Sequence, residues 1–105
     1  LVVDVNKLQL DGPTADVLDA GTLAQKFVAF GCEVEEVDGH DVVAVRDALL
    51  RRSDRPRAVL CDTAKGRGIS FIEGRVEWHD KTMTDEERAI ATRELDEAEE
   101  AIRRG

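Results

Sequence analysis

The stretch Leu1-Val2-Val3-Asp4-Val5-Asn6-Lys7 decides how this chain is expected to fold. Its first five residues form a short, nearly continuous apolar run, and the polar pair Asn6-Lys7 ends it. Such a run is typical of a buried strand in a parallel sheet. The polar end matters because open α/β sheets bind ligands beyond the carboxyl ends of their strands. We therefore expect a functional site near Asn6.

Beyond this stretch, the sequence alternates between helical and extended patterns. A turn is expected at 11–14 and is followed by helices near 22–30 and 41–52, strands at 33–37 and 57–62, a long glycine-containing loop at 63–83, and a helix at 84–105. This order is typical of βαβ units with right-handed crossovers. It predicts an α/β fold: a partial doubly wound, mainly parallel sheet of about three strands, with flanking helices and a C-terminal amphipathic helix.

The expected helices have apolar faces. In the first helix, Leu23, Phe27 and Phe30 share one face, and Gly31 is a C-terminal stop. The last helix opens at Thr84 with Glu87 three residues later, the pattern of a capping box. One face of that helix carries four apolar residues: Ala91, Leu95, Ala98 and Ile102. The pairs Glu99–Arg103 and Glu100–Arg104 are expected on its outside.

Composition excludes several classes of function. The 105 residues include 23 acidic and 15 basic side chains, for a net charge of −8, so general affinity for nucleic acid or anionic membrane is not expected. No apolar run approaches the roughly 20 residues that span a bilayer, so we expect a cytoplasmic protein. Cys32 and Cys61 have neither metal-binding nor redox spacing and are expected to be buried structural thiols.

Two oxygen donors stand at the end of the first strand. Asn6 offers a side-chain carbonyl oxygen, and Leu8 can turn its backbone carbonyl the same way. Hard cations such as Mg²⁺ or Ca²⁺ prefer oxygen ligands and take about six of them. These two residues can therefore only complete a site that others begin. By residue type alone, Asn6 is also a common turn-former, and that alternative stays open.

The long loop carries groups suited to phosphate. In Lys65-Gly66-Arg67-Gly68, the glycines let backbone N–H groups approach an anion and the cations add charge. His79 can hydrogen-bond phosphate oxygens and titrates near neutrality, although a single loop histidine, such as His79 or His40, is more often an ordinary loop residue. Solvated loops have the same composition, so these residues alone leave both interpretations open.

Four ordered blocks resemble the diphosphate-binding domain of transketolases. They are Asn6-Lys7-Leu8-Gln9-Leu10-Asp11-Gly12, the stretch from Phe30 that ends in Val37-Asp38-Gly39-His40-Asp41, the loop Thr63-Ala64-Lys65-Gly66-Arg67-Gly68-Ile69-Ser70-Phe71, and Glu77-Trp78-His79. The last two are similar to the family's "KG(K/R)G" and "WHG" elements. The resemblance covers about Leu1 to Met83.

The resemblance implies thiamine diphosphate as cofactor, together with Mg²⁺ or Ca²⁺. In the family, an asparagine side chain and the backbone carbonyl two residues later bind the metal ion, and these roles carry to Asn6 and Leu8. Leu10 would be an apolar wall beside the thiamine. Val5 departs from the family pattern, which commonly has a polar residue before the asparagine, so a supporting contact of the ligand is altered.

The same resemblance gives roles to the loop. Lys65 and His79 are expected near the diphosphate and the reacting centre, as catalytic and cofactor-binding residues, and Gly66 as a cofactor-binding residue. Asp80 stands where the family usually has glycine and adds negative charge near the diphosphate.

Parts of the family's site are missing from this sequence. The Gly-Asp-Gly element, whose aspartate binds the metal ion, precedes the asparagine in the family, and a pyrimidine-binding domain supplies the glutamate that activates the cofactor. We expect other transketolase subunits to supply both. Residues 1–83 would be the C-terminal part of the diphosphate-binding domain, and 84–105 a helix packing on it or on a partner. Because the chain starts at Leu1 within a strand, we expect a truncated or processed product, or a further leading segment.

The resemblance favours one function among three. The first is a component of a split or truncated transketolase-like transferase, inactive alone, which moves a two-carbon ketol unit between phosphosugar-like substrates. The second is a 1-deoxyxylulose-phosphate-synthase-like component, which would use the same domain on another donor. The third is a non-catalytic assembly or regulatory module that retains the fold, with its acidic C-terminal helix as one contact surface.

Overall fold

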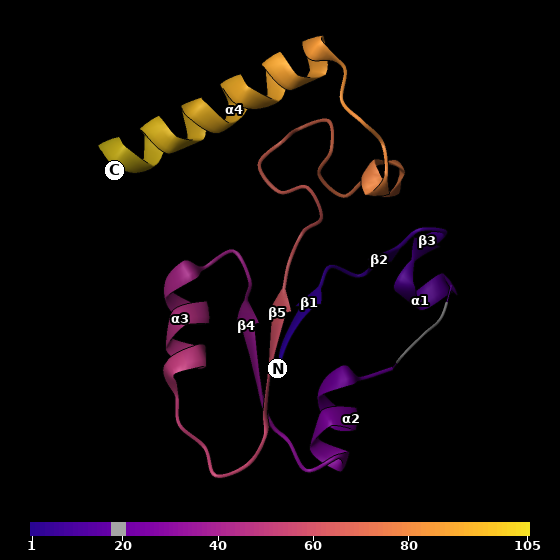
Figure 1. Cartoon of the computed structure of the whole chain (residues 1–105), viewed down its shortest axis with the longest axis vertical. Coiled ribbons are helices and arrows are strands. Elements are labelled where there is room, and N and C mark those ends of the chain that lie inside the picture. Colours follow the sequence, from indigo (N-terminus) through magenta and orange to yellow (C-terminus); the bar gives the residue numbers. More distant parts are fainter. Residues whose placement is uncertain (18–20) are drawn as a thin grey trace. The chain divides into compact units, whose positions relative to one another are not determined.

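A computed structural model describes residues 1–17 and 21–105 (Figure 1). These residues divide into two compact units. Unit 1 comprises Leu1–Lys7 and Pro13–Thr63, and unit 2 comprises Leu8–Gly12 and Ala64–Gly105. Each unit is described by itself below.

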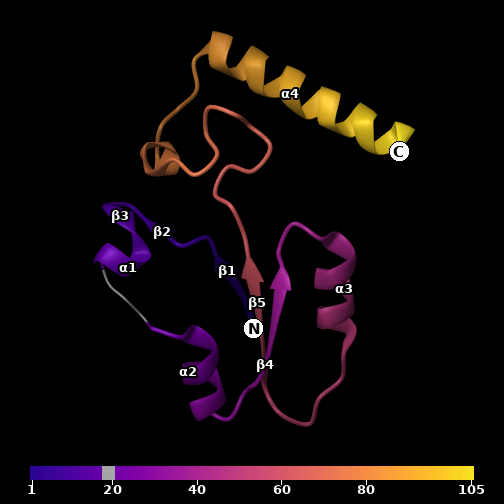
Figure 2. The same ribbon diagram turned by 180° about the vertical axis from the view of Figure 1, so that it is seen from behind.

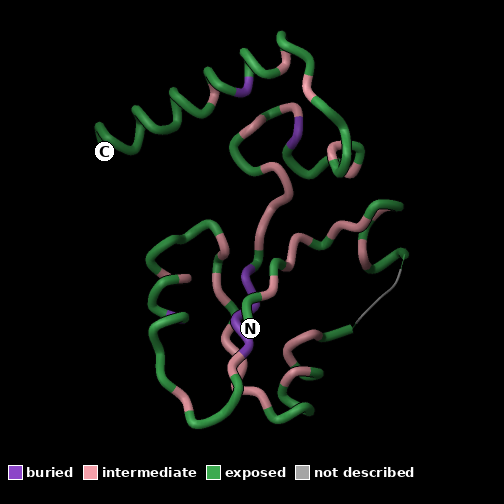
Figure 3. Tube along the Cα trace, in the orientation of Figure 1, coloured by how far each residue is buried: buried purple, intermediate pink, exposed green. Residues whose placement is uncertain are grey.

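Unit 1 is built on the predicted parallel sheet. The strands are β1 (Val2–Val5), β4 (Glu33–Asp38) and β5 (Arg57–Asp62), and their order in the sheet is β1-β5-β4. Both pairings are parallel. The apolar stretch Ala58–Cys61 of β5 is buried throughout, which makes the central strand the core of the unit (Figure 3). The fold class predicted from the sequence is confirmed.

The first strand is more exposed among the described residues than its apolar run indicates. β1 forms where the apolar run predicts it, but it lies at an edge of the sheet, where Leu1 is 71% and Val2 54% exposed. A continuous apolar run indicates a strand buried on both faces, and in this sheet only β5 is enclosed between two neighbours. The run therefore identified the strand but not its place in the sheet.

Helices α2 (Leu23–Ala29) and α3 (Val42–Leu50) connect the strands. The chain passes from β1 across to β4 and then back to β5, so right-handed crossovers place the two helices on opposite faces of the sheet. Figures 1 and 2 show α2 and α3 on opposite sides. Ala48 of α3 packs with Val59 and Cys61 of β5. This is the doubly wound arrangement expected from the sequence.

The expected apolar face of α2 is shorter than predicted. The helix ends at Ala29, and Phe30 is its C-cap and is 87% exposed. Gly31 follows with a positive φ of 85°, and its N–H donates to the carbonyl of Val28, so the glycine stop is confirmed. A four-residue helix, α1 (Thr14–Val17), precedes α2 and has no counterpart in the prediction.

Of the two cysteines, Cys61 is buried as expected, whereas Cys32 is only half-buried.

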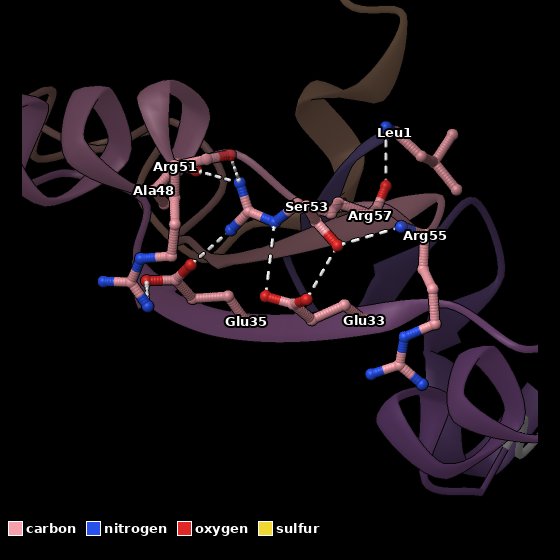
Figure 4. Close-up of polar contacts among 8 residues, drawn as sticks. All are labelled: Leu1, Glu33, Glu35, Ala48, Arg51, Ser53, Arg55 and Arg57. Atoms are coloured by element: carbon pink, nitrogen blue, oxygen red, sulfur yellow. Dashed lines mark hydrogen bonds and ion pairs between the residues drawn. The ribbon is translucent and has the colours of Figure 1, made fainter.

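Arg57 holds α3 and β4 together at the amino end of the sheet (Figure 4). Its guanidinium donates to the backbone carbonyls of Ala48 and Arg51 at 2.6 Å each and to Glu35 at 2.5 Å. A second carboxylate, that of Glu33, lies 3.7 Å from its Nε. The Arg57 side chain is only 13% exposed, so this cluster is a part-buried ion pair that also binds the last turn of α3.

Unit 2 contains the long loop and the last helix. The loop holds a 3₁₀ helix, η1 (Val76–His79), and the helix α4 spans Asp85–Arg104. Two very short strands, β2 (Leu8–Gln9) and β3 (Gly12–Pro13), pair where the sequence indicates a turn. No helix in the described ranges is both long and apolar enough to cross a membrane.

Helix α4 begins as predicted. The Thr84 hydroxyl accepts from the Glu87 N–H, and the Glu87 carboxylate accepts from the Thr84 N–H at 2.9 Å, which completes the capping box. The ion pairs Glu99–Arg103 and Glu100–Arg104 are present at 2.6 Å and 3.4 Å. On the apolar face of α4, Ala91 is buried. Leu95 and Ile102 of the same face are exposed among the described residues.

Candidate functional site

The carboxyl ends of the three strands bring polar residues to one edge of the sheet in unit 1. Val5 and Asp38 are both register partners of Asp62, so the strands end level with one another. Asn6, which is half-buried, follows directly after β1, and Thr63 follows β5. This edge is where an open parallel sheet positions a ligand.

The carboxylates at this edge already have hydrogen-bond partners. Lys7 Nζ lies 2.7 Å from Asp62 Oδ1, and the Thr63 hydroxyl donates to Asp4. Asp38 Oδ1 accepts from the His40 N–H at 2.9 Å. No group of three or more His, Cys, Asp or Glu side chains in the described part of the chain is arranged to hold a metal ion. Among the described residues, this edge therefore combines the Asn6 amide with carboxylates that accept hydrogen bonds from neighbouring groups.

Lys7 is a feature that sequence analysis missed. It has a φ of 62°, the only positive φ among the described non-glycine residues, and it directly follows Asn6. This left-handed conformation is uncommon for a side-chain-bearing residue and is held here by two interactions. The ammonium pairs with Asp62, and the Lys7 carbonyl accepts from the Thr14 N–H at 2.9 Å. The residue type gave no signal, because glycine and asparagine are the usual residues at such positions.

Gly39 is required where β4 passes into α3. A Cβ at this position would collide with the Thr63 methyl group and come within 3.0 Å of Cys61 Cβ. Its N–H donates to the Asp62 carbonyl at 2.8 Å, and Asp41 then caps α3 through the Val43 and Ala44 N–H groups. The Asp38–Asp41 stretch therefore closes the end of the sheet tightly against β5.

In unit 2, the segment with Lys65 and Gly66 forms a loop closed on itself. The Gly74 N–H donates to the Lys65 carbonyl at 2.9 Å, so the two ends of the loop meet. Gly66 has a φ of 70°, and a Cβ there would collide with the buried Ile72. Lys65 itself is half-buried. The glycine thus lets the backbone approach Ile72 and sets the turn that carries the lysine.

His79 lies at the end of η1 and is exposed. Its neighbour Trp78 is anchored: the ring centroid lies 5.3 Å from that of Phe71, and Lys81 Nζ is 4.0 Å above the indole. Lys81 also donates to Glu87 at 2.9 Å, which connects the segment to the first turn of α4. Tryptophan and lysine therefore fix the backbone that presents the histidine.

A second contact joins the loop to α4. The Glu94 carboxylate accepts from both the hydroxyl and the N–H of Ser70, at 2.5 Å and 2.7 Å. These bonds, the hydroxyl first, lower the pKa of Glu94. In the same way, the Thr84 N–H and then Lys81 lower the pKa of Glu87. Both helix carboxylates therefore stay ionised and bonded near neutral pH.

The sequence-predicted residues divide between the units. Asn6 belongs to unit 1, at the end of β1, and the other five belong to unit 2. Those five are Leu8 in β2, Leu10, Lys65, Gly66 and His79. Leu8 is half-buried, and Leu10 is 58% exposed. Within unit 2, the structure places Lys65 and Gly66 in the closed loop and His79 on η1, each connected to α4 through a glutamate.

The sequence matches the family described as "Transketolase, thiamine diphosphate binding domain" over residues 1–100. An apulose-4-phosphate transketolase subunit from Actinobacillus succinogenes is 45% identical over 97 residues, which cover 90% of this chain and 35% of that protein. The 6-deoxy-6-sulfo-D-fructose transketolase subunit SqwG of a Clostridium species is 35% identical over 96 residues, 89% of this chain and 35% of that protein.

Human transketolase-like protein 2 is also similar, with 39% identity over 101 residues, 93% of this chain and 16% of that protein. The chain thus spans 35% of the length of each of the two bacterial relatives and less of the human protein. The family match extends over nearly all of the sequence, through both units of the structure. On this match, the chain belongs to the transketolase family, in its thiamine diphosphate binding domain.

Proposed function

We propose that this chain contributes part of the thiamine diphosphate site of a split transketolase-like enzyme, a transferase that moves a two-carbon ketol unit between phosphosugar-like substrates. The observation that carries the proposal is the family match over residues 1–100. It is supported by the names of two relatives, which both describe one subunit of a transketolase. Because the chain spans 35% of those relatives, the rest of the site would come from residues outside it.

The residues present fit part of such a site. Asn6 would supply a side-chain oxygen and Leu8 a backbone carbonyl to Mg²⁺ or Ca²⁺, which bind oxygen ligands. In the family, the metal's carboxylate ligand belongs to a Gly-Asp-Gly element, which would come from residues outside this chain. The neutral amide oxygen of Asn6 and a carboxylate from outside this chain could then bind the same metal ion.

On the diphosphate side, Lys65 and His79 are the proposed contacts. Lys65 would place an ammonium group on the phosphate oxygens, and Gly66 lets the backbone turn without a side chain in the way. Exposed His79 would donate a hydrogen bond to a phosphate or substrate oxygen. Leu10, which is 58% exposed, would lie beside the thiamine ring.

Bound thiamine diphosphate would supply carbanion chemistry, and the protein would position it. The chain's own residues would bind the metal ion, hold the diphosphate and provide a proton donor. A pyrimidine-binding domain on another transketolase subunit would complete the site.

We also propose that residues 1–83 form the C-terminal part of the diphosphate-binding domain, with residues 84–105 packed on it or on a partner. The Glu94–Ser70 contact supports packing on the same chain.

The test is native mass spectrometry of the full-length protein purified from its own source with thiamine diphosphate and Mg²⁺. We expect a complex that retains the cofactor and contains a chain carrying a Gly-Asp-Gly element. The same preparation should transfer a ketol unit from a ketose phosphate and be inactive with pyruvate as donor. Turnover of pyruvate would favour a 1-deoxyxylulose-phosphate-synthase-like enzyme. A complex without cofactor or activity would indicate a non-catalytic module and overturn the proposal.

A further inference from the structure

The loop that carries Lys65 is attached to helix α4 through one side chain. Both oxygens of the Glu94 carboxylate are used: Oε1 accepts from the Ser70 hydroxyl at 2.5 Å, and Oε2 accepts from the Ser70 N–H at 2.7 Å. Hydrogen bonds to an ionised acceptor are about twice as strong as neutral ones, and a two-point contact also fixes orientation. Ser70 is thereby held in both position and direction.

The hydrogen bond that closes the loop connects the position of Ser70 to that of Lys65. Ser70 lies between Lys65 and Gly74, whose backbone groups bond at 2.9 Å and close the loop. Inside the closed loop, the Gly68 N–H donates to Glu73 at 3.2 Å. Ile72 packs against Gly66. A shift of Ser70 therefore moves a small, internally bonded ring of residues that includes Lys65.

Helix α4 provides a rigid support for this contact. The capping box at Thr84 and Glu87 fixes the first turn of the helix, and Ala91 is buried one turn before Glu94. The next residue of α4, Leu95, lies 3.6 Å from the position a Cβ would take on Gly68. The loop is thus bonded to α4 at Ser70, and Leu95 lies beside Gly68 on the same helix.

We infer that Glu94 is a positioning residue that holds the Lys65–Gly74 loop in the conformation that binds the diphosphate. The inference rests on the proposed function, because it assumes that Lys65 and Gly66 face the cofactor. It assigns to α4 a part in forming the site, beyond packing on the domain or on a partner. Small displacements of positioned groups reduce binding and rate strongly, so loss of the Glu94 carboxylate should act on the cofactor at a distance.

The experiment compares variants of the assembled, full-length enzyme. Hydrogen exchange of amides 66–74 and the Kd for thiamine diphosphate at saturating Mg²⁺ are measured for Glu94→Ala, Glu94→Gln and Ser70→Ala. Glu97→Ala is the matched control, because Glu97 is an exposed glutamate of the same helix. Lys65→Ala reports separately whether the loop binds the cofactor at all.

We expect Glu94→Ala to speed amide exchange across the loop and to raise the Kd for thiamine diphosphate about tenfold. A change of this size is expected when part of the free energy of one charge-assisted hydrogen bond is lost. Glu94→Gln keeps one acceptor and should give a smaller increase. The Ser70→Ala/Glu94→Ala double variant should bind the cofactor no more weakly than Glu94→Ala alone, because Glu94→Ala already removes both hydrogen bonds. Glu97→Ala should change neither quantity. Should Glu94→Ala fail to fold, Ser70→Ala tests the contact from the loop side: it removes the hydroxyl bond, keeps the N–H bond, and should give a smaller effect of the same sign.

Two results would overturn the inference while leaving the proposed function in place. One is unchanged loop exchange in both Glu94→Ala and Ser70→Ala. The other is faster exchange with an unchanged Kd, when Lys65→Ala does raise the Kd. If Lys65→Ala also leaves the Kd unchanged, the Lys65 side chain does not bind the cofactor and the inference fails, whereas the proposed function is tested separately by cofactor retention in the native complex.

Discussion

At the scale of single residues, the end of the sheet is packed so closely that Gly39 has no room for a side chain. We expect Gly39→Ala to lower the free energy of unfolding by about 1–3 kcal/mol, the usual cost of forcing a methyl group into a filled space. The new Cβ would meet the Thr63 methyl group and Cys61 Cβ. Urea denaturation of the full-length protein measures the change.

Gly31→Ala is the matched control for Gly39→Ala. Gly31 has open space around its Cβ position but a φ of 85°, so alanine there should cost only the backbone strain of about 1 kcal/mol. An unchanged free energy of unfolding in Gly39→Ala would contradict the close packing of the β4–α3 turn against β5.

The stability of the first turn of α4 at acidic pH should depend on the protonation of Glu87. The Thr84 N–H and Lys81 lower its pKa below that of an unfolded glutamate, so the unfolded chain binds more protons in this range. The stabilisation from Glu87 is therefore complete above the unfolded pKa of about 4.3 and is lost as the pH falls through the lower folded value. We expect the protection factors of amides in the first turn of α4, which correct for the intrinsic pH dependence of exchange, to fall over that range in the native protein.

Replacement of the charged group tests this assignment. Glu87→Gln should remove the pH dependence of the first-turn protection factors and lower them at neutral pH, because glutamine has no charge and only one side-chain oxygen to replace the two that accept from Lys81 and Thr84. Glu86→Gln alters the exposed neighbouring carboxylate and should leave the curve unchanged. A similar pH dependence in Glu87→Gln would show that another group controls the first turn.

At the scale of elements, Arg57 joins the end of α3 to β4. We expect Arg57→Met to lower the free energy of unfolding by about 3 kcal/mol, because in a part-buried site it leaves two backbone carbonyls without this donor and Glu35 with only its 3.3 Å ion pair to Arg51 among the described residues. Arg46→Met is the control, since Arg46 pairs with its neighbour Asp47 at an exposed position. Equal, small effects in both variants would mean that the cluster is solvated and weak.

Local sequence signals predicted most elements, for identifiable reasons. The β5 strand, the glycine stop at Gly31 and the Thr84 capping box follow from hydrophobic pattern and terminal residues, which act within a few positions. These local signals do not predict the order of the strands across the sheet. The apolar run at Leu1–Val5 indicates a strand but cannot show that β5 lies in the centre, because strand order depends on crossovers far apart in sequence.

At the scale of the whole molecule, the candidate site was predictable only in part. The order of strands implied that polar residues would gather at one edge, and Asn6 and Thr63 do follow strands that end level. The supporting residues could not be predicted. Lys7 gives no local sign of a positive φ, and Glu94 resembles any surface glutamate until the fold brings Ser70 to it. Such partners are determined by tertiary contact alone.

The measurement that tests the central claim most directly is the Mg²⁺-dependent affinity of the assembled, full-length enzyme for thiamine diphosphate, by isothermal titration calorimetry, in Asn6→Ala. Gln25→Ala, an exposed amide of α2, is the matched control. We predict loss of a metal ligand in Asn6→Ala, with the Kd raised at least about tenfold, in line with one lost contact to a charged group, and no change in the control. Wild-type affinity in Asn6→Ala would contradict the assignment of this chain to the cofactor's metal site.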